Sequence, residues 1–326
     1  MKKVLSVVVL FLLFFGLVGC GKERTYVADG VYVAWQFGTN SGNVLNEDGT
    51  PYKKGEGDAA ETFKSVQPVL STVSVEIRND EIVRYEIDER QAKSYVKTVA
   101  EDGTITAVTW KFNAQTKREL KYGYGMESRA AQGEWFQTIV VLENSWLKSE
   151  PKAVASVSIS HDNYIELAKE AIQKAKDGDA SAVYPGEHYT YDVVYAEADV
   201  DKDGKLTNVE FDAMVFGYGQ TAADVYDSVS KTFNYAWPEK TKYDGYGAMR
   251  DGAKWQDQID TLQKYIKDNG FDGSLCSSVN ADNGKHKGLN IANEVPSALT
   301  SVTIQANGEI TVLVELLSNF PNAWAE

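Results

Sequence analysis

An internal repeat runs through most of the 326-residue chain and limits the folds that are open to it. A Tyr-Gly-rich segment at 122–126 is followed by Trp135 and a helical pattern, and a similar segment at 243–249 is followed by Trp255. In both copies a leucine comes seven residues after the tryptophan, which places the two side chains on one helix face. The sequence therefore predicts that one structural unit occurs twice.

Further elements recur in the same order in both copies. Alternating apolar and polar residues flank a turn at 78–81 in the first copy and a turn at 201–204 in the second. Both patterns predict β-hairpins. The tryptophan-bearing segments 135–147 and 255–266 have the periodicity of helices.

Each copy ends in a short apolar segment and a further element. The segments 153–159 and 298–304 are similar and alternate as short strands do. Asp162 is a suitable cap for a helix at 163–176, whereas 307–317 is consistent with either helix or strand. We therefore predict an α+β protein of two tandem similar domains, each an antiparallel sheet with packed helices. The expected division is a signal peptide (1–19), a tether (20–28), a first repeat (29–177), a linker (178–183) and a second repeat (184–326).

The N-terminus has the pattern of an export signal. Lys2 and Lys3 precede an apolar run at 4–18, which is shorter than the ~20 residues that a membrane-spanning helix needs. The sequence Leu-Val-Gly-Cys at 17–20 resembles the cleavage box of bacterial lipoproteins, and this resemblance fits better than an ordinary secretory peptide. It implies that the mature chain begins at Cys20, which would carry the diacylglyceryl and palmitate lipid. We expect a chain anchored in the cell membrane on the extracytoplasmic face.

The predicted tether is short. Fewer than ten residues separate Cys20 from the start of the first repeat, so the tether spans about 30 Å at most when fully extended. We therefore expect the first repeat to lie close to the membrane and the second to extend outward.

Composition excludes several classes of function. A formal charge of -14 disfavours nucleic acid or an anionic lipid surface as a partner, because both would repel the chain. If Cys20 carries lipid, Cys276 has no partner for an intramolecular disulfide. The three histidines are not grouped at metal-ligand spacing, and neither a phosphate-binding loop nor a hydrolase constellation can be assembled. We expect no enzyme with catalytic residues of its own.

One acidic segment matches the spacing of a calcium-binding EF-hand loop. Asp199, Asp201, Asp203 and Glu210 occupy ligand positions of that loop. An EF-hand needs a helix on each side, however, and the residues on both sides alternate as strands do. The pattern favours a tight hairpin turn over a calcium site.

The two similar terminal segments bear a family resemblance. With the lipoprotein box and the duplicated body, 153–159 and 298–304 resemble tandem FMN-binding-domain lipoproteins of bacterial cell surfaces. In that family a dedicated flavin transferase links FMN through its phosphate to a threonine hydroxyl, and the matching hydroxyls here are Ser158 and Thr303. Ser156 and Ser301 stand where the family has glycine.

The resemblance implies extracytoplasmic electron transfer from a membrane electron donor, with FMN as the redox cofactor. The flavin ring is expected to stack near Tyr124 or Tyr246, with Trp135 and Trp255 behind them. Loop glycines beside ordinary core aromatic residues would give the same pattern. The alternative function is a surface lipoprotein that binds no flavin and acts as an antigen or a small-ligand receptor. Calcium-dependent adhesion or sensing is a third reading of Asp199 and its neighbours.

Overall fold

The structure is a computed structural model that describes residues 23–126, 133–186, 191–248, 252, 254–270, 302, 307–320 and 322–323. The strands are β1 (Gly30–Leu45), β2 (Lys53–Lys54), β3 (Glu61–Thr62), β4 (Lys64–Arg78), β5 (Glu81–Val99), β6 (Ile105–Phe112), β7 (Asp179–Pro185), β8 (Asp192–Val200), β9 (Leu206–Val215), β10 (Tyr226–Asp227) and β11 (Thr232–Phe233). The helices are α2 (Lys117–Leu120), α3 (Trp135–Trp146), α4 (Asp162–Asp177), α5 (Ala222–Val225), α6 (Lys242–Gly245), α7 (Trp255–Asn269) and α9 (Asn307–Ser318), with short 3-10 turns η1 (Gly57–Ala59) and η2 (Lys121–Tyr124).

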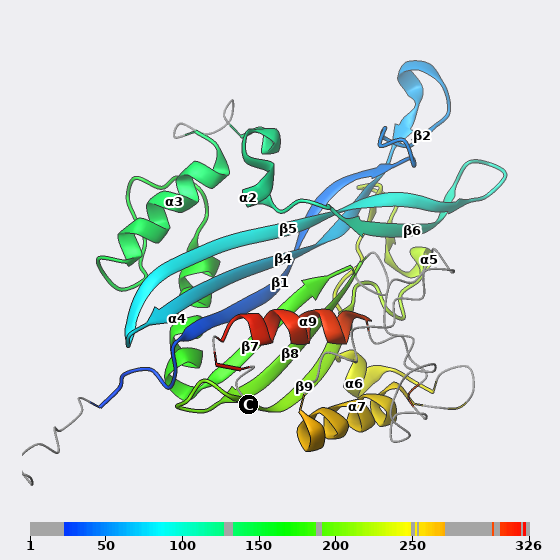
Figure 1. Cartoon of the computed structure of the whole chain (residues 1–326). Coiled ribbons are helices and arrows are strands. Elements are labelled where there is room, and N and C mark those ends of the chain that lie inside the picture. Colours follow the sequence, from blue (N-terminus) through cyan, green and yellow to red (C-terminus); the bar gives the residue numbers. More distant parts are fainter. Residues whose placement is uncertain are drawn as a thin grey trace, which may run out of the picture.

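The first sheet is built on three long antiparallel strands, β1, β4 and β5 (Figure 1). The β4–β5 hairpin turns on Asn79 and Asp80, whose φ angles of 54° and 63° suit a two-residue turn between twisted strands. The end of β1 pairs in parallel with β5, at Val44 and Ser94, so the sheet curls on itself. Strand β11 extends the sheet beyond β4, although it comes from the second half of the chain.

The second sheet is the antiparallel meander β7, β8 and β9. Strands β8 and β9 are joined by the turn predicted at 201–204, which closes on Gly204 with a φ of 79°. Both predicted hairpins are therefore confirmed.

Helices cover each sheet in a repeated arrangement. Helix α4 crosses β1 and β4, and α9 crosses β7 and β8 (Figure 1). Helix α3 packs on β5, and α7 packs on β9. Helix α4 faces the sheet with Ala168, Ala171 and Ala175, which are fully buried and small enough to let the helix lie close to the strands. Each half thus has three antiparallel strands covered by two longer helices, and the α+β class is confirmed.

One apolar core joins the two halves. Its buried residues include Tyr32 and Leu142 from the first half and Ala196, Leu262 and Leu316 from the second. The Ser181 hydroxyl of β7 donates a hydrogen bond of 2.7 Å to the carbonyl oxygen of Val33 in β1. The apolar faces of the two halves are therefore buried against each other as well as within each half, and two separate tandem domains are not confirmed.

Three local expectations need correction. The expected linker 178–183 is mostly strand β7. Segment 153–159 forms no strand, because it turns at Val154 and buries only Val157 against the core. The ambiguous final element is a helix, α9.

Most of the segment 298–304 lies outside the described residues. Its one described residue, Val302, is buried. Among the described residues, none of the helices is both long and apolar enough to cross a bilayer.

Candidate functional site

A partly buried lysine lies against two aromatic rings in the first half of the chain. The Lys117 ammonium is 4.9 Å from the centre of the Tyr124 ring and 5.4 Å from that of Trp135. It also pairs with the Glu89 carboxylate at 2.5 Å, and Glu89 accepts a 2.7 Å hydrogen bond from the Tyr164 hydroxyl. Burial, with the nearby Glu89 charge, raises the pKa of Tyr164 above its ordinary value. We call these five residues the first lysine cluster.

The second half also places a lysine against a tyrosine ring and a tryptophan ring. The Lys242 ammonium lies 5.2 Å from the centre of the Tyr246 ring and 4.8 Å from that of Trp255. Burial lowers the pKa of Lys242, although the charges of Glu309 and Asp192 oppose this shift. Glu309 is the third residue of α9, as Tyr164 is the third residue of α4. Lys242, Tyr246, Trp255 and Glu309 form the second lysine cluster.

Matching hydrogen bonds hold the two lysine-bearing helices in place. Asp88 on β5 accepts a hydrogen bond of 3.2 Å from the backbone N–H of Arg118 in α2. Asp212 on β9 accepts one of 2.9 Å from the backbone N–H of Tyr243 in α6. Burial raises the pKa of both carboxyl groups. In both halves the lysine is the first residue after the helix cap. The lysine side chain therefore comes from the same end of its short helix in each cluster.

The longer helices repeat a second bond to the sheet. The Glu143 side chain of α3 accepts a hydrogen bond of 2.8 Å from the N–H of Ile87, and the Gln263 side chain of α7 accepts one of 2.7 Å from the N–H of Phe211. Glu143 and Gln263 each follow the helix-initiating tryptophan by eight residues. These bonds tie α3 to β5 and α7 to β9.

Tyr246 also borders an aromatic groove with a volume of about 490 Å³. Its lining includes Trp110, Tyr191, Phe216, Tyr218, Tyr235 and Tyr246. The rings of Tyr218 and Tyr246 are stacked, with centroids 4.8 Å apart and planes inclined by 22°. Tyr218 is 42% exposed, so part of its surface is accessible from the groove. Lys97 contributes a positive charge to the lining.

A close backbone approach shapes the floor of this groove. Gly217 has a φ of 71°, and a Cβ atom there would lie 3.0 Å from the Trp110 ring. The Trp110 indole in turn donates a hydrogen bond of 2.9 Å to the carbonyl oxygen of Val66 in β4. Glycine at 217 therefore lets the loop that carries Tyr218 pack directly on the tryptophan.

The structure separates the residues that the sequence grouped around a flavin. Tyr124 belongs to the first lysine cluster, and Tyr246 belongs to both the second cluster and the aromatic groove. Ser158 is exposed in the loop before α4 and does not line the groove. Thr303 and Cys20 lie outside the described residues.

Sequence reasoning missed Tyr218, although a signal was present. Residues 217–219 read Gly-Tyr-Gly, as do 123–125 and 245–247. The two lysines gave no comparable signal, because Lys117 precedes its tyrosine by seven residues and Lys242 precedes its tyrosine by only four.

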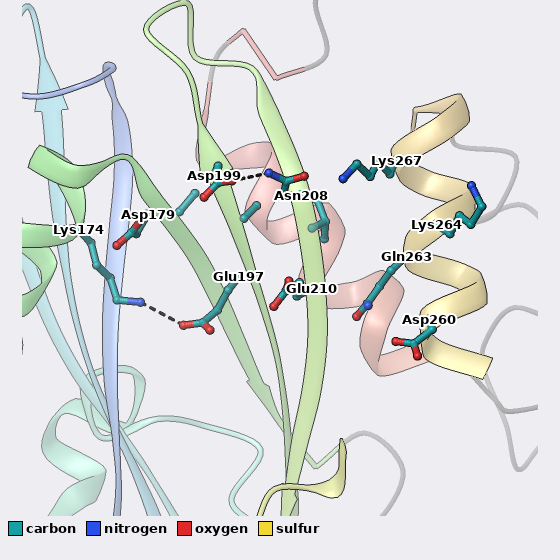
Figure 2. A pocket seen from close by; sticks show the side chains of 13 residues that line it. Lys174, Asp179, Glu197, Asp199, Asn208, Glu210, Asp260, Gln263, Lys264 and Lys267 are labelled. Carbon is teal, nitrogen blue, oxygen red and sulfur yellow. Dashed lines mark hydrogen bonds and ion pairs between the residues drawn. The ribbon is translucent and has the colours of Figure 1, made fainter. Parts of the chain in front are cut away.

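The calcium candidates fall at a hairpin and a polar groove. Asp201 accepts hydrogen bonds from the backbone N–H groups of Asp203 and Lys205, at 2.9 and 3.0 Å, and the bond from Lys205 is the main cause of its lowered pKa. Asp199 and Glu210 instead line a groove of 520 Å³ between β8, β9 and α7 (Figure 2).

Lysines share this polar groove with the carboxylates. Lys264 and Lys267 come from α7, and Asn208 donates a hydrogen bond of 2.6 Å to Asp199 (Figure 2). Within the described part of the chain, His, Cys, Asp and Glu side chains form no group of three or more that could hold a metal ion. Strands rather than helices flank the turn, in agreement with the preferred hairpin interpretation.

Comparison with known proteins adds no relative: the chain matches no protein-family model, no curated protein and no solved structure.

Proposed function

We propose that this chain is a lipid-anchored extracytoplasmic protein that binds a flavin in the aromatic groove and carries electrons. The observation that supports the proposal is the stacked pair Tyr218 and Tyr246, which presents a partly exposed aromatic surface in a groove of 490 Å³. That volume lies within the range of pockets that bind small molecules, about 300–1,000 Å³. A flat aromatic ring system gains dispersion and stacking energy on such a surface.

The residues of the groove fit FMN in character. Tyr218 offers a stacking surface, Gly219 leaves open space beside it, and Lys97 offers a positive charge for a phosphate. When bound, FMN supplies the redox chemistry, while the protein positions it and limits its contact with water. Stacking requires no covalent bond to Ser158 or Thr303, the hydroxyls that the family resemblance assigns to attachment.

The test is an FMN titration of the mature lipoprotein in detergent, followed by flavin fluorescence. We expect Tyr218→Ala to weaken binding about tenfold or more, because aromatic stacking contributes about 1–3 kcal/mol per ring. Tyr122→Ala is the control, since Tyr122 is 63% exposed but contacts Phe136 outside the groove. The groove is the wrong site if Tyr218→Ala binds FMN as tightly as the wild type does.

A second candidate function is a surface lipoprotein that binds no flavin. It is favoured by Lys117 and Lys242, whose ammonium groups lie against the tyrosine rings that the sequence assigned to flavin stacking. Protein coexpressed with a flavin transferase separates the candidates. Absence of FMN mass on the peptides that contain Ser158 and Thr303, together with no binding of added FMN, would establish this second function.

A further inference from the structure

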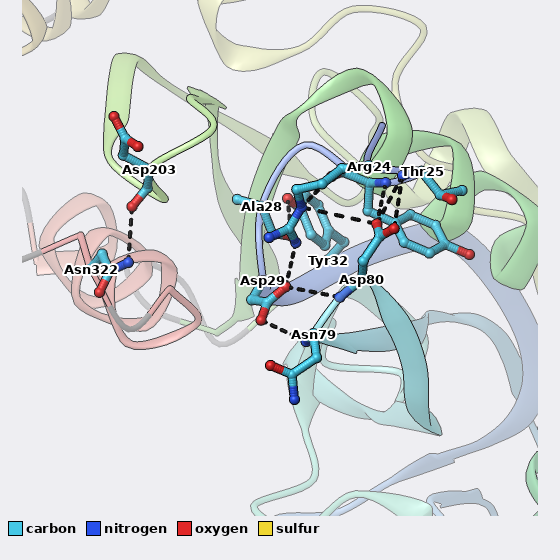
Figure 3. A network of polar contacts seen from close by, with 10 residues as sticks. Arg24, Thr25, Ala28, Asp29, Tyr32, Asn79, Asp80, Asp203 and Asn322 are labelled. Carbon is cyan, nitrogen blue, oxygen red and sulfur yellow. Dashed lines mark hydrogen bonds and ion pairs between the residues drawn. The ribbon is translucent and has the colours of Figure 1, made fainter. Parts of the chain in front are cut away.

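Residues just after the predicted lipid site are fastened to the β4–β5 turn. The Asp80 carboxylate accepts hydrogen bonds of 2.9 Å from the backbone N–H groups of both Thr25 and Tyr26 (Figure 3). The Arg24 guanidinium forms an ion pair with the Asp29 carboxylate. We call residues 24–29 and the turn that holds them the N-terminal clamp.

The hydrogen bonds of the clamp run in both directions, because the backbone of the turn also donates hydrogen bonds to the N-terminal segment. Asp29 accepts from the backbone N–H of Asn79 at 2.7 Å and from that of Asp80 at 3.3 Å (Figure 3). These contacts join residues about fifty positions apart in the chain. Charge-assisted bonds of this kind are stronger than neutral ones, so the segment is held as part of the folded body.

The second half reaches the same end of the molecule. The N–H of Val27 donates a hydrogen bond of 3.0 Å to the carbonyl oxygen of Ala175, in the last turn of α4. Gly178, which caps α4, accepts a hydrogen bond of 2.7 Å at its carbonyl oxygen from the N–H of Val200. Val200 ends β8, and therefore the β8–β9 turn lies near the clamp. The Asn322 side chain also binds that turn, through the Asp203 carbonyl oxygen at 3.0 Å (Figure 3). The β8–β9 turn of the second half therefore lies at the same end of the molecule as the β4–β5 turn of the first half.

This clamp shortens the effective tether. From Cys20 to Arg24 there are four residues, which span about 14 Å at most when fully extended. A lipid on Cys20 would therefore hold the clamped end within about 14 Å of the membrane surface, and not within the 30 Å estimated from the sequence.

The aromatic groove is at the opposite end of the long strands. The Trp110 indole in the groove is hydrogen-bonded to the carbonyl oxygen of Val66 in β4. Arg78, at the clamped end of β4, comes twelve residues after Val66. At about 3.3 Å per residue, twelve residues of strand correspond to about 40 Å. Strand β6 and helix α5 lie on the opposite side of the molecule from the N-terminal segment (Figure 1).

We propose that the N-terminal clamp makes the protein stand end-on at the membrane, with the aromatic groove facing away from it. The formal charge of -14 opposes a flat orientation, because anionic lipids repel an acidic body. The groove then meets a soluble extracytoplasmic partner rather than a protein buried in the bilayer. This inference rests on the proposed function for the lipid anchor and for what the groove carries.

The test measures energy transfer to acceptor lipids in vesicles of phosphatidylcholine and phosphatidylglycerol that carry the full lipidated chain. A Cys276→Ser background receives one fluorophore, either through Glu81→Cys beside the clamp or through Val229→Cys near β11. Both sites are exposed, Val229 by 92%. We expect transfer from position 81 to be several-fold stronger than from position 229.

Loosening the clamp supplies the matched comparison. The double variant Asp29→Ala/Asp80→Ala should reduce the difference between the two labels, whereas Asp102→Ala, in the exposed turn after β5, should not. Equal transfer from both labels, or failure of the chain to bind vesicles, would overturn the end-on orientation. The FMN titration is independent: a large difference in transfer with no FMN binding would leave the orientation standing and sink the flavin proposal.

Discussion

Lys117 and Glu89 form an ion pair whose side chains are only 11% and 9% exposed. Both charges have little contact with water, so each depends largely on the other and on the surrounding rings and hydroxyl group. Tyr164 completes the arrangement from α4, and the pair therefore links the sheet, α2 and α4. Loss of one partner should cost more than the pair itself contributes.

We predict that Lys117→Met lowers the free energy of unfolding by about 3–5 kcal/mol, because it leaves the Glu89 carboxylate buried without its partner. The double variant Lys117→Met/Glu89→Gln should recover much of that loss. Lys264→Met is the control, since its pair with Asp268 is exposed and should contribute no more than about 1 kcal/mol. Urea unfolding at pH 7 measures all three. Equal losses in Lys117→Met and Lys264→Met would contradict the prediction.

Buried tyrosines should make the fold sensitive to alkali. Burial raises the pKa of Tyr32 to about 12 and that of Tyr85 to about 12, from an ordinary value of 10.0. Below pH 10 both the folded and the unfolded chain keep these protons. Between pH 10 and 12 the unfolded chain loses them first, and stability must fall as the pH rises.

The double variant Tyr32→Phe/Tyr85→Phe should show a smaller loss of stability between pH 9 and 11 than the wild type, when each is unfolded in urea. Tyr32→Phe also removes the 3.1 Å hydrogen bond to the Ala28 carbonyl oxygen, which lowers stability by about 1 kcal/mol at every pH. An unchanged pH dependence in the double variant would show that other groups cause the alkaline loss.

At the scale of elements, α2 and α6 are four-residue helices that cannot be stable alone. Each begins at a threonine whose side chain accepts a hydrogen bond from the first turn, at Thr116 and at Thr241. Asp88 and Asp212 then tie the two helices to their sheets. The position of each of the two lysines depends on these tertiary bonds.

We predict that Asp88→Ala speeds hydrogen exchange at the Arg118 amide and leaves the Tyr243 amide unchanged, while Asp212→Ala does the reverse. Each carboxylate accepts its own amide, and loss of such a buried bond costs about 1–3 kcal/mol. The two variants serve as controls for each other. Exchange that rises equally at both amides in either variant would show global destabilisation instead of local release of one helix.

At the scale of the whole molecule, the two halves of the chain share a core. Apolar residues of β1 and α3 pack in one cluster with those of β8, α7 and α9. Strands β11 and β10 of the second half also extend the first sheet beyond β4. Neither half buries its apolar surface alone.

We therefore predict that fragments 23–178 and 179–326 each lack cooperative unfolding, whereas the full chain unfolds in a single transition. Near-ultraviolet circular dichroism during thermal unfolding measures this, because buried tryptophans occur in both halves, as Trp135 and Trp255. A fragment that melts cooperatively by itself would show that one half is an independent domain.

Local chemistry predicted much of the architecture. The turn at Asn79 and Asp80, the helices begun by Trp135 and Trp255, and the repeated order of elements all follow from patterns within a few residues. Segment 153–159 was the failure of this approach, because alternation indicates a strand only where a neighbouring strand is available to pair with it. Tyr246 was placed at a candidate site, but its partner Tyr218 was not identified.

The sequence by itself determined the α+β class and the hairpins, since both depend on periodicity and turn chemistry close along the chain. Only the tertiary structure decided that the halves share one core, that Lys117 and Lys242 each lie against a tyrosine ring and a tryptophan ring, and that the clamp lies opposite the aromatic groove. These features join residues far apart in sequence. Their contacts depend on how whole strands and helices pack, which no short pattern of residues specifies.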